Sequence, residues 1–295
     1  MRRLLDIDLQ LIRVFRAIVE AQGLSGAQFV LNLSQPRVSA RLAELEQRLG
    51  VKLCKRGRGG FALTEAGAKV YEASEDLFQA VDRFSNRAGL VSDKLRRVLR
   101  LGTVDALVTN DRFSLARALK RFRRHAPSVL VDFTMAGPEE LERQLVAGSR
   151  DVAIMPNQNR RGELAYRKLF EERQSLYCAR GHRLFEREEA RIAPNDLEAS
   201  AFVARSYLHS EDLKRVGHRG ADATVETMEA QLILILSGEF IGYLPAHYAE
   251  GWVRRGQLRG LGEKTFSYNS VFYAASQGGA AENPLVQRFL DALGR

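Results

Sequence analysis

The chain has 295 residues, of which 45% are hydrophobic, so it is long enough for about two or three domains with apolar cores of their own. Its first ten residues lack the apolar core of a secretory signal, and no run is long and apolar enough to span a membrane, so we expect neither secretion nor membrane insertion. The net charge is +9, but residues 1–100 hold 18 Lys and Arg against 11 Asp and Glu, a net +7, which leaves +2 for the remaining 195 residues. A basic first third on a nearly neutral remainder indicates nucleic-acid binding at the N-terminus.

Two helices are predicted at the start of the chain. Asp8 can cap an amphipathic helix with the sequence LQLIRVFRAIVEAQ, which Gly23 ends. A second, short helix is predicted over about residues 25–31, and Asn32-Leu33 makes a tight turn after it. A short helix followed by a tight turn is typical of the first half of a helix-turn-helix.

The next predicted helix, SQPRVSARLAELEQRLG, begins at Ser34 as its N-cap and is stopped by Gly50, with Pro36 tolerated in its first turn. One side carries an apolar stripe, formed by Val38, Leu42, Leu45 and Leu49. The other side crowds hydrogen-bond donors into the first half of the helix, namely Gln35, Arg37, Ser39 and Arg41. Such a helix is either an ordinary amphipathic surface helix or a recognition helix that enters a major groove.

A basic β-hairpin is predicted directly after this helix. Val51 and Leu53 indicate one short strand, and residues 61–63 can return as a second strand. The tip between them is rich in glycine and carries Arg56 and Arg58. Beside a recognition helix, this hairpin would form a wing that meets the DNA backbone.

Residues 6–67 resemble the winged helix-turn-helix of the LysR-type transcriptional regulators. The residues that carry the resemblance are Leu33-Ser34-Gln35-Pro36, Val38-Ser39, Leu45-Glu46, Leu49-Gly50-Val51, Leu53, Arg56 and Leu63-Thr64-Glu65-Ala66-Gly67. This chain departs from the family by having Cys54 in place of the usual Phe. The resemblance implies that residues 1–67 bind double-stranded operator DNA, with contacts from Ser34, Gln35, Pro36, Arg37, Ser39, Arg41, Arg56 and Arg58.

One long helix is predicted from Thr64 to Asp93. Apolar residues repeat every seven positions at Val70, Leu77, Phe84 and Val91, and a second series four positions later contains Ser74, Val81 and Ala88. This seam either packs on its own domain or pairs two chains. Residues 68–93 are similar to the linker helix through which the family dimerises, and that similarity implies a dimer seam containing Val70, Leu77, Val81 and Phe84.

Residues 94–295 alternate between strands and helices, which implies a parallel sheet with helices on both faces. Strands are expected at 97–104, 129–136, 151–156, 174–182, 201–206, 240–245 and 271–276, and helices at 112–125, 138–148, 225–238 and 283–294. The segment resembles the family's effector domain, a two-lobed α/β fold like the type 2 periplasmic binding proteins, with lobe 1 at about 94–162 and 268–295 and lobe 2 at about 163–267. The motifs that carry this resemblance are Leu101-Gly102, Asp151-Val152-Ala153-Ile154 and Gly242-Tyr243-Leu244-Pro245.

In such a fold a small molecule binds between the lobes, where strand ends and helix starts favour an anion. Thr103 can donate a hydroxyl bond and Arg205 can clamp a carboxylate, whereas Asp105 would repel an anion and attract an amine. Arg205 can equally be a surface salt-bridge partner, and His247 a helix cap. The candidate effector residues are Thr103, Val104, Asp105, Met135, Pro156, Arg205, Ser206, Pro245 and His247.

No catalytic or metal-binding pattern stands out. The five histidines form no i,i+4 pair, and neither a P-loop nor a GxSxG elbow is present. Cys54 and Cys178 fall in different predicted domains, so we expect no structural disulfide and a cytoplasmic location. The carboxylate pair Glu139-Glu140 is expected to belong to a solvated helix face. We therefore expect neither enzymatic activity nor a metal or cofactor.

The sequence thus predicts a cytoplasmic, DNA-binding transcription regulator that responds to a small molecule, with an anion favoured. The resemblance implies a dimer of dimers. The alternatives are a small-molecule binding protein or enzyme whose N-terminal domain only dimerises, and a structural nucleoid protein. The basic wing and the uneven charge speak against the first alternative, and the two-lobed body against the second.

Overall fold

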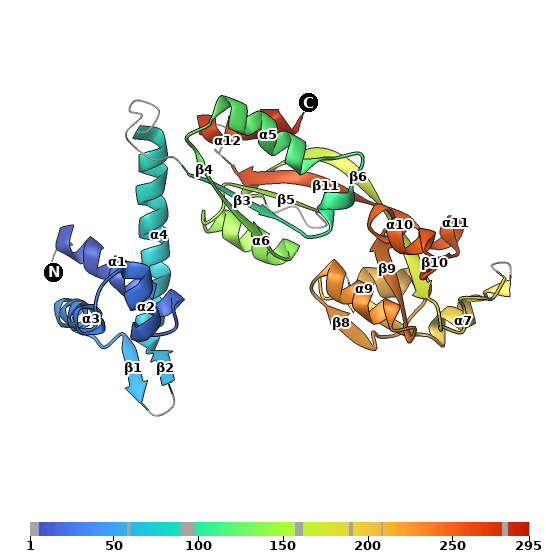
Figure 1. The fold of residues 1–295 in the computed structure, drawn as a ribbon, viewed down its shortest axis with the longest axis horizontal. Coiled ribbons are helices and arrows are strands. Elements are labelled where there is room, and N and C mark those ends of the chain that lie inside the picture. The colour runs from blue at the N-terminus through green and yellow to red at the C-terminus, as the bar shows by residue number, and fades with distance from the viewer. Residues whose placement is uncertain are drawn as a thin grey trace. The chain divides into compact units, whose positions relative to one another are not determined.

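The computed structural model describes residues 6–57, 60–88, 98–156, 162–188, 191–207, 209–278 and 283–294. The chain divides into two compact units, Met1–Phe84 and Ser85–Arg295. Figure 1 shows the helices of the first unit and the sheet-based fold of the second. Within the described ranges, no helix has the length and apolar character needed to cross a membrane.

The first unit contains a helix-turn-helix followed by a hairpin. Its elements are α1 (Asp6–Glu20), α2 (Leu24–Leu31), α3 (Gln35–Leu49), β1 (Cys54–Gly57) and β2 (Gly60–Leu63). The two strands pair antiparallel, with Cys54 opposite Leu63. The stripe on α3 is buried at Val38, Leu42 and Leu45, where it packs on α1. This confirms the predicted packing face of this helix at these three positions.

Three local predictions for this unit were wrong. Asp8 lies inside α1, buried and paired with Arg48 of α3, so it does not cap the helix. The first wing strand starts at Cys54, after Val51 and Leu53. Leu49 is 36% exposed, because the helix leaves the core at its last turn. The predicted N-cap position of Ser34 is confirmed, with extended backbone, although its side chain makes no capping hydrogen bond.

The helix α4 (Glu65–Ala88) is anchored to the wing at its first turn. The hydroxyl of Thr64 accepts the N–H of Gly67 at 2.9 Å and donates to the carbonyl of Lys52 at 2.6 Å. A Cβ on Gly67 would lie 2.0 Å from the carbonyl oxygen of Leu53, so only glycine allows this approach. The Thr-Glu-Ala-Gly run therefore fixes where the helix leaves the wing.

The predicted seam on α4 has two environments. Val70 and Leu77 are half-buried against the core of their own unit, and Phe78, which lies outside the heptad series, is buried there. Phe84 is 71% exposed, and Val91 lies outside the described residues. The first half of the seam thus packs on its own domain, and dimerisation through Phe84 and its neighbours stays a prediction.

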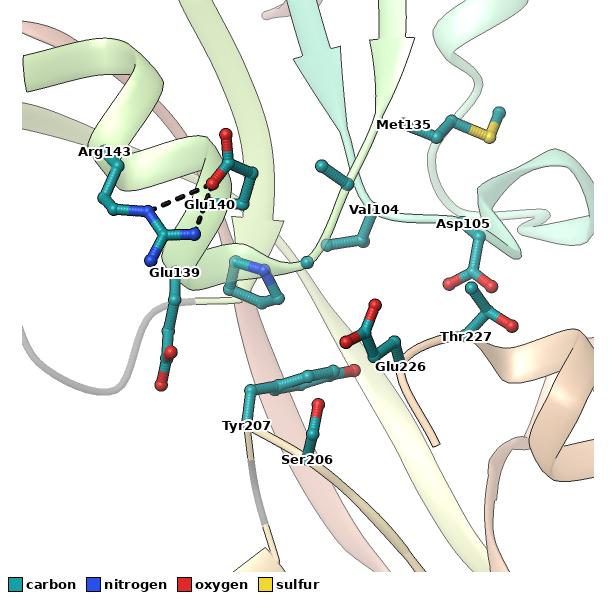
Figure 2. Close-up of a pocket in the computed structure, with 13 residues that line it drawn as sticks. Val104, Asp105, Met135, Glu139, Glu140, Arg143, Ser206, Tyr207, Glu226 and Thr227 are labelled. Carbon is teal, nitrogen blue, oxygen red and sulfur yellow. Dashed lines mark hydrogen bonds and ion pairs between the residues drawn. The ribbon is translucent and has the colours of Figure 1, made fainter. Parts of the chain in front are cut away.

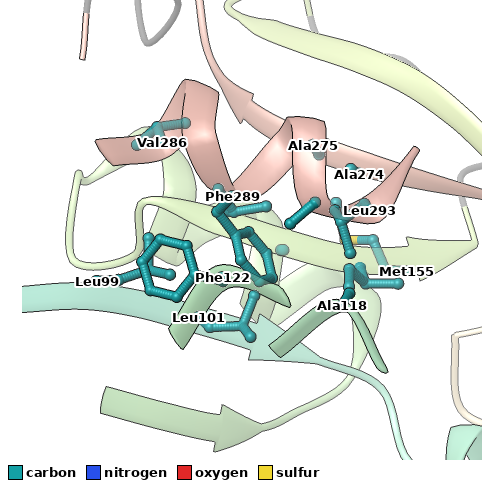
Figure 3. Close-up of a cluster of buried hydrophobic side chains, with 14 of the residues drawn as sticks. Leu99, Leu101, Ala118, Phe122, Met155, Ala274, Ala275, Val286, Phe289 and Leu293 are labelled. Atoms are coloured by element: carbon teal, nitrogen blue, oxygen red, sulfur yellow. The ribbon is translucent and has the colours of Figure 1, made fainter. Parts of the chain in front are cut away.

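The first lobe of the second unit is built on a parallel sheet. Strand β3 (Val98–Thr103) lies between β4 (Leu130–Met135) and β5 (Val152–Pro156). The helices α5 (Leu115–His125) and α12 (Pro284–Leu293) cover one face, and α6 (Pro138–Val146) covers the other (Figure 1). Figure 3 shows the core under α5 and α12, where the rings of Phe122 and Phe289 meet edge to face with centroids 5.6 Å apart.

Two long strands carry the chain between the lobes. Strands β6 (Leu164–Ala179) and β11 (Tyr268–Gln277) pair antiparallel in the middle of a sheet with the order β4-β3-β5-β11-β6-β9-β7-β8. The second lobe adds β7 (Ala201–Arg205), β8 (Ala223–Val225), β9 (Phe240–Pro245) and β10 (Leu258–Leu261), the last paired with β6. The predicted two-lobed α/β architecture is confirmed.

Helices cover both faces of the second lobe's sheet. Successive residues of β6 point into different cores, with Leu176 and Cys178 in one and Tyr177 and Ala179 in the other. The helices are α7 (Pro194–Glu198), α8 (His209–Val216), α9 (Met228–Leu236), α10 (Ala246–Arg254) and α11 (Glu263–Phe266). Of these, only α9 was predicted, and the short helix η1 (Leu107–Thr109) was also missed.

Candidate functional site

The helix α3 carries its hydrogen-bond donors off its buried stripe, on the flanks of the helix. Gln35, Pro36 and Arg37 are exposed, and Arg41 is half-buried. Arg37 and Arg41 are one helical turn apart, so their side chains share a face. Neither forms an ion pair with a described residue. The first-turn N–H groups of α3 lie at the same end of the helix as these donors, and the Ser34 side chain makes no capping hydrogen bond to them. This arrangement is suited to binding a phosphate group.

A buried carboxylate joins the recognition helix to the wing. Glu46 is 7% exposed, and its Oε1 accepts the N–H groups of Leu53 at 2.9 Å and Cys54 at 3.3 Å. Its Oε2 accepts from Lys52 at 2.7 Å. Burial opposes the charge, but these donors outweigh it and hold the pKa of Glu46 below its usual value. Glu46 therefore positions the wing relative to α3, a role that sequence analysis did not assign, although Leu45-Glu46 belongs to the family motif.

The wing itself is described only in part. Arg56 lies on β1 with its backbone opposite Phe61, but its side chain is outside the described atoms, and Arg58 lies outside the described residues. Lys55 on the same strand is exposed. The contacts of Arg56 and Arg58 with DNA therefore stay predictions.

A cavity of about 470 Å³ lies between the two lobes. The first lobe contributes the residues after β3 and the segment from the end of β4 into α6, and the second lobe contributes those after β7 and β8. Figure 2 shows Asp105 and Met135 on one side and Ser206, Tyr207 and Glu226 on the other. The predicted residues Val104, Asp105, Met135 and Ser206 line this cavity.

The other predicted effector residues do not line it. The hydroxyl of Thr103 is buried and donates to the carbonyl of Ile154 at 3.2 Å, so the sheet uses it. Pro156 lies in the β5–β11 ladder opposite Phe272. Pro245 is buried before the start of α10.

Arg205 points into the second lobe rather than into the cavity. It is 2% exposed, and its guanidinium donates to both carboxylate oxygens of Asp212 at 2.9–3.0 Å. It also donates to the Tyr268 hydroxyl at 2.5 Å and to Gln174 at 3.3 Å. The predictions of an anion clamp and of a surface salt bridge were both wrong, because Arg205 forms a buried structural pair.

His247 connects the lobes beside the crossover strands. Its Nδ1 lies 2.8 Å from the Thr109 hydroxyl of η1, and its Nε2 lies 2.8 Å from the buried carboxylate of Glu172. These contacts differ from both roles predicted for His247, that of an effector ligand and that of a helix cap. His247 forms a polar link between the lobes.

The interlobe cavity is acidic. Its lining contains four carboxylates and one guanidinium, that of Arg143, which pairs with Glu140. Among the described residues, Glu139 and Glu226 have no ion-pair partner. Asp105 accepts the N–H of Met228 at 2.6 Å, and burial raises its pKa. Burial also raises the pKa of Tyr207 to about 12, so its phenol stays neutral. The cavity therefore suits a positively charged group better than an anion.

Known families match both units. Residues 9–68 match the model of the bacterial regulatory helix-turn-helix protein of the lysR family, and residues 92–295 match the LysR substrate binding domain. The chain belongs to the LysR family of transcriptional regulators. This LysR-type regulator is 37% identical to the HTH-type transcriptional activator BauR of Pseudomonas aeruginosa, over 98% of this chain and 95% of the relative.

Solved structures agree with this fold. Full-length CbnR in complex with its target DNA superposes with a TM-score of 0.67 at 20% identity, over 97% of this chain and 98% of that one. A variant of full-length OxyR from Pseudomonas aeruginosa superposes with a TM-score of 0.63 at 16% identity, over 99% of this chain and 95% of that one. At such identities the likeness establishes the fold. The LysR-type regulator thus combines a DNA-binding helix-turn-helix with an effector-type domain.

Proposed function

We propose that this LysR-type regulator reads its operator through α3 and the wing, and that a small molecule bound between the lobes changes its effect on transcription. The observation that carries the proposal is the interlobe cavity, which takes its lining from both lobes. A ligand there contacts both lobes, so it favours the lobe arrangement in which both sets of contacts are made. The similarity to BauR, a named activator, favours activation.

The acidic lining supports a ligand with a protonated amino group. A plain anion, which the sequence favoured, would meet Asp105, Glu139 and Glu226 without a free guanidinium to balance them. An ammonium group near Asp105 would donate a charge-assisted hydrogen bond to it and bring the carboxyl pKa back down. A carboxylate on the same molecule would have only Arg143 available, and only if it competed with Glu140. The favoured effector is therefore an amine, or an amino acid whose amino group lies at Asp105.

The assembly is proposed to be a dimer of dimers that acts on chromosomal DNA in the cytoplasm. Pairing through the exposed part of α4 at Phe84 would bring two recognition helices to two half-sites. The oligomer is supported by the family to which the chain belongs. Sedimentation of the purified protein at several concentrations measures its state directly.

Two experiments test the proposal in turn. DNA binding is measured by fluorescence anisotropy on the promoter beside the gene and on a scrambled duplex, over a range of salt concentrations. Selective, salt-dependent binding to the promoter supports regulation. Equal binding to both duplexes would contradict it and favour a nucleoid role.

The effector is tested by a thermal-shift screen of the full-length protein with amines, amino acids and dicarboxylates. We expect hits among amine-bearing compounds, and a loss of about tenfold or more in their affinity in Glu226→Gln. The matched control is Glu186→Gln, which neutralises an exposed carboxylate of the second lobe outside the cavity. Hits confined to dicarboxylates, or hits equally sensitive to both variants, would contradict the proposed ligand charge.

A further inference from the structure

A second cavity of about 470 Å³ lies in the first lobe, apart from the residues that line the interlobe cavity. It is bordered by the loop before α5, by the first turns of α5, by the start of β6 and by the end of α12. Five cationic side chains line it, and no carboxylate does. They are Arg112, Arg117, Arg121, Arg167 and Lys168. Its charge is therefore opposite to that of the interlobe cavity.

Among the described residues, one ion pair involves the cations of this cavity. Lys168 pairs with Glu171 at 2.6 Å. None of the four arginines forms an ion pair with a described carboxylate. Like charges gathered around one cavity repel each other, and a bound anion would relieve that repulsion.

Two of the arginines are held in place without losing their charge. Arg121 donates from Nε to the carbonyl of Ala292 at 3.0 Å, and Arg167 donates from Nη1 to the carbonyl of Leu290 at 3.0 Å. Both acceptors belong to the last turns of α12. A Cβ on Gly294 would lie 2.1 Å from Nη2 of Arg167, so the guanidinium rests directly on the backbone there. The cations are thus positioned before a ligand arrives, which lowers the entropy lost on binding.

The start of α5 adds to the same field. Ser114 lines the cavity as the N-cap of this eleven-residue helix, and its hydroxyl accepts the N–H of Arg117 at 3.3 Å. The positive end of the helix dipole therefore lies beside the cations. A cavity, fixed guanidinium groups and a helix N-terminus together form an arrangement that fits phosphate or carboxylate groups.

We propose that this cavity, here called the basic cavity, binds a small molecule with two or more anionic groups. Organic diphosphates and tricarboxylates share that chemistry. The cations converge on one hollow from the loop before α5, from α5 and from β6, which suits a compact polyanion better than an extended DNA strand. Because the two cavities carry opposite charges, this ligand is distinct from the amine-bearing effector, and the regulator would respond to two metabolites.

The test is isothermal titration calorimetry of the full-length protein at low ionic strength, with inorganic pyrophosphate in one series and citrate in the other. The variant Arg112→Gln with Arg117→Gln removes two lining cations whose side chains make no hydrogen bond to a described residue. Its matched control, Lys120→Gln with Arg124→Gln, removes the same charge from exposed positions of α5 outside the cavity. We expect saturable binding of one of the two probes and a loss of about tenfold or more in the cavity variant, against about twofold or less in the control.

The probe series identify the anionic group, because pyrophosphate binding without citrate binding assigns a phosphate site and the reverse assigns a carboxylate site. Glu226→Gln should leave this binding unchanged, which separates the basic cavity from the interlobe cavity. Absence of saturable binding of both probes to the wild-type protein would overturn the proposal. Equal losses in the cavity variant and the control would also overturn it, because general attraction would then explain the binding. Selective loss of binding to a scrambled DNA duplex in the cavity variant, with probe binding unchanged, would assign the face to DNA instead.

Discussion

The carboxylate of Asp105 in the first lobe accepts a hydrogen bond from the backbone N–H of Met228 in the second lobe, with 2.6 Å between Oδ2 and N. Met228 is the first residue of α9, so the carboxylate lies at the positive end of that helix. His247 makes another link between the lobes, to Thr109 of η1. Because Asp105 also lines the interlobe cavity, one side chain both holds the lobes together and faces the ligand.

The first prediction follows from the pKa of Asp105, which burial raises. When the pKa of a carboxyl group is higher in the folded than in the unfolded protein, the free energy of unfolding falls as the pH rises from the unfolded-state pKa to the folded-state pKa. We expect Asp105→Asn, which keeps an oxygen for Met228, to raise the Tm of the unliganded protein slightly at pH 7, with a smaller difference at pH 4. Asp105→Ala removes the acceptor and should lower stability by about 1–3 kcal/mol. Scanning calorimetry of both variants measures this, and equal destabilisation by both would contradict it.

The second prediction concerns Glu46, which joins α3 to the wing. Glu46→Ala leaves the buried N–H of Leu53 without its acceptor, so we expect a loss of about 1–3 kcal/mol in the free energy of unfolding. Operator affinity should fall as well, because the wing is no longer held against α3. Since the pKa of Glu46 is lowered in the folded protein, its contribution is present at neutral pH and is lost as the pH falls through that lowered value.

Denaturant unfolding at pH 7 and pH 4 and anisotropy on the operator test this role. Glu44→Ala is the matched control, because Glu44 is exposed on the same helix. A control that lost as much stability as Glu46→Ala would show that helix charge, rather than the link to the wing, is responsible.

The third prediction concerns base recognition by α3. Arg37 and Arg41 share a face away from the buried stripe, so each should contact a base edge or a phosphate. Replacing a base-reading arginine with Ala should cost about 1–3 kcal/mol and relax the preference at one base pair. Binding to a set of single-base operator variants reveals this pattern. Lys120→Ala with Arg124→Ala removes equal charge from α5 and should leave selectivity intact; unchanged selectivity in the α3 double variant would mean that another face reads the operator.

The fourth prediction separates two positions of the α4 seam. Leu77 packs on the core of its own unit, whereas Phe84 is 71% exposed. Phe84→Glu should therefore weaken dimerisation without lowering the stability of the N-terminal unit, because a charge would be buried only in the pair. Leu77→Glu should destabilise the unit itself. Sedimentation velocity combined with thermal unfolding distinguishes these outcomes, and a Phe84→Glu protein that sediments as the wild type would place the dimer contact elsewhere.

Sequence patterns predicted those features that depend on nearby residues. The stripe of Val38, Leu42 and Leu45 follows the helical period, and its burial was predicted correctly. Val104 and Asp105 were predicted to face the cavity because strand ends in an α/β fold meet there. These predictions needed only local spacing and the fold class.

The remaining features of the fold and the site depend on contacts between residues that are far apart in the sequence. No element was predicted for the first ten residues of β6, LAYRKLFEER, and they form a strand because β11 pairs with them along their length. Glu139 and Glu140 were expected on a solvated face, and only the approach of the second lobe makes them part of a cavity. Local sequence does not distinguish an arginine that turns inward from one that faces solvent.

The last prediction concerns Arg205, the arginine that points into the second lobe. Arg205 and Asp212 are almost fully buried and joined by three hydrogen bonds of 2.9–3.0 Å, so removing one partner leaves the other charge in the core. We expect Arg205→Met to lower the free energy of unfolding by about 3–5 kcal/mol, and Arg205→Met with Asp212→Leu to recover much of that loss. The pair of Arg187 and Asp196 lies nearer the solvent and is the matched contrast, where Arg187→Met should cost far less.

Denaturant unfolding of the full set gives the coupling energy of the buried pair. Arg205 does not line the interlobe cavity, although its guanidinium lies over the ring of Tyr207, which does, so the stabilised double variant should still bind the same amine-bearing effector. Ligand binding that stays lost in a well-folded double variant would contradict this expectation and show that the site needs Arg205, by contact with the effector or by holding Tyr207.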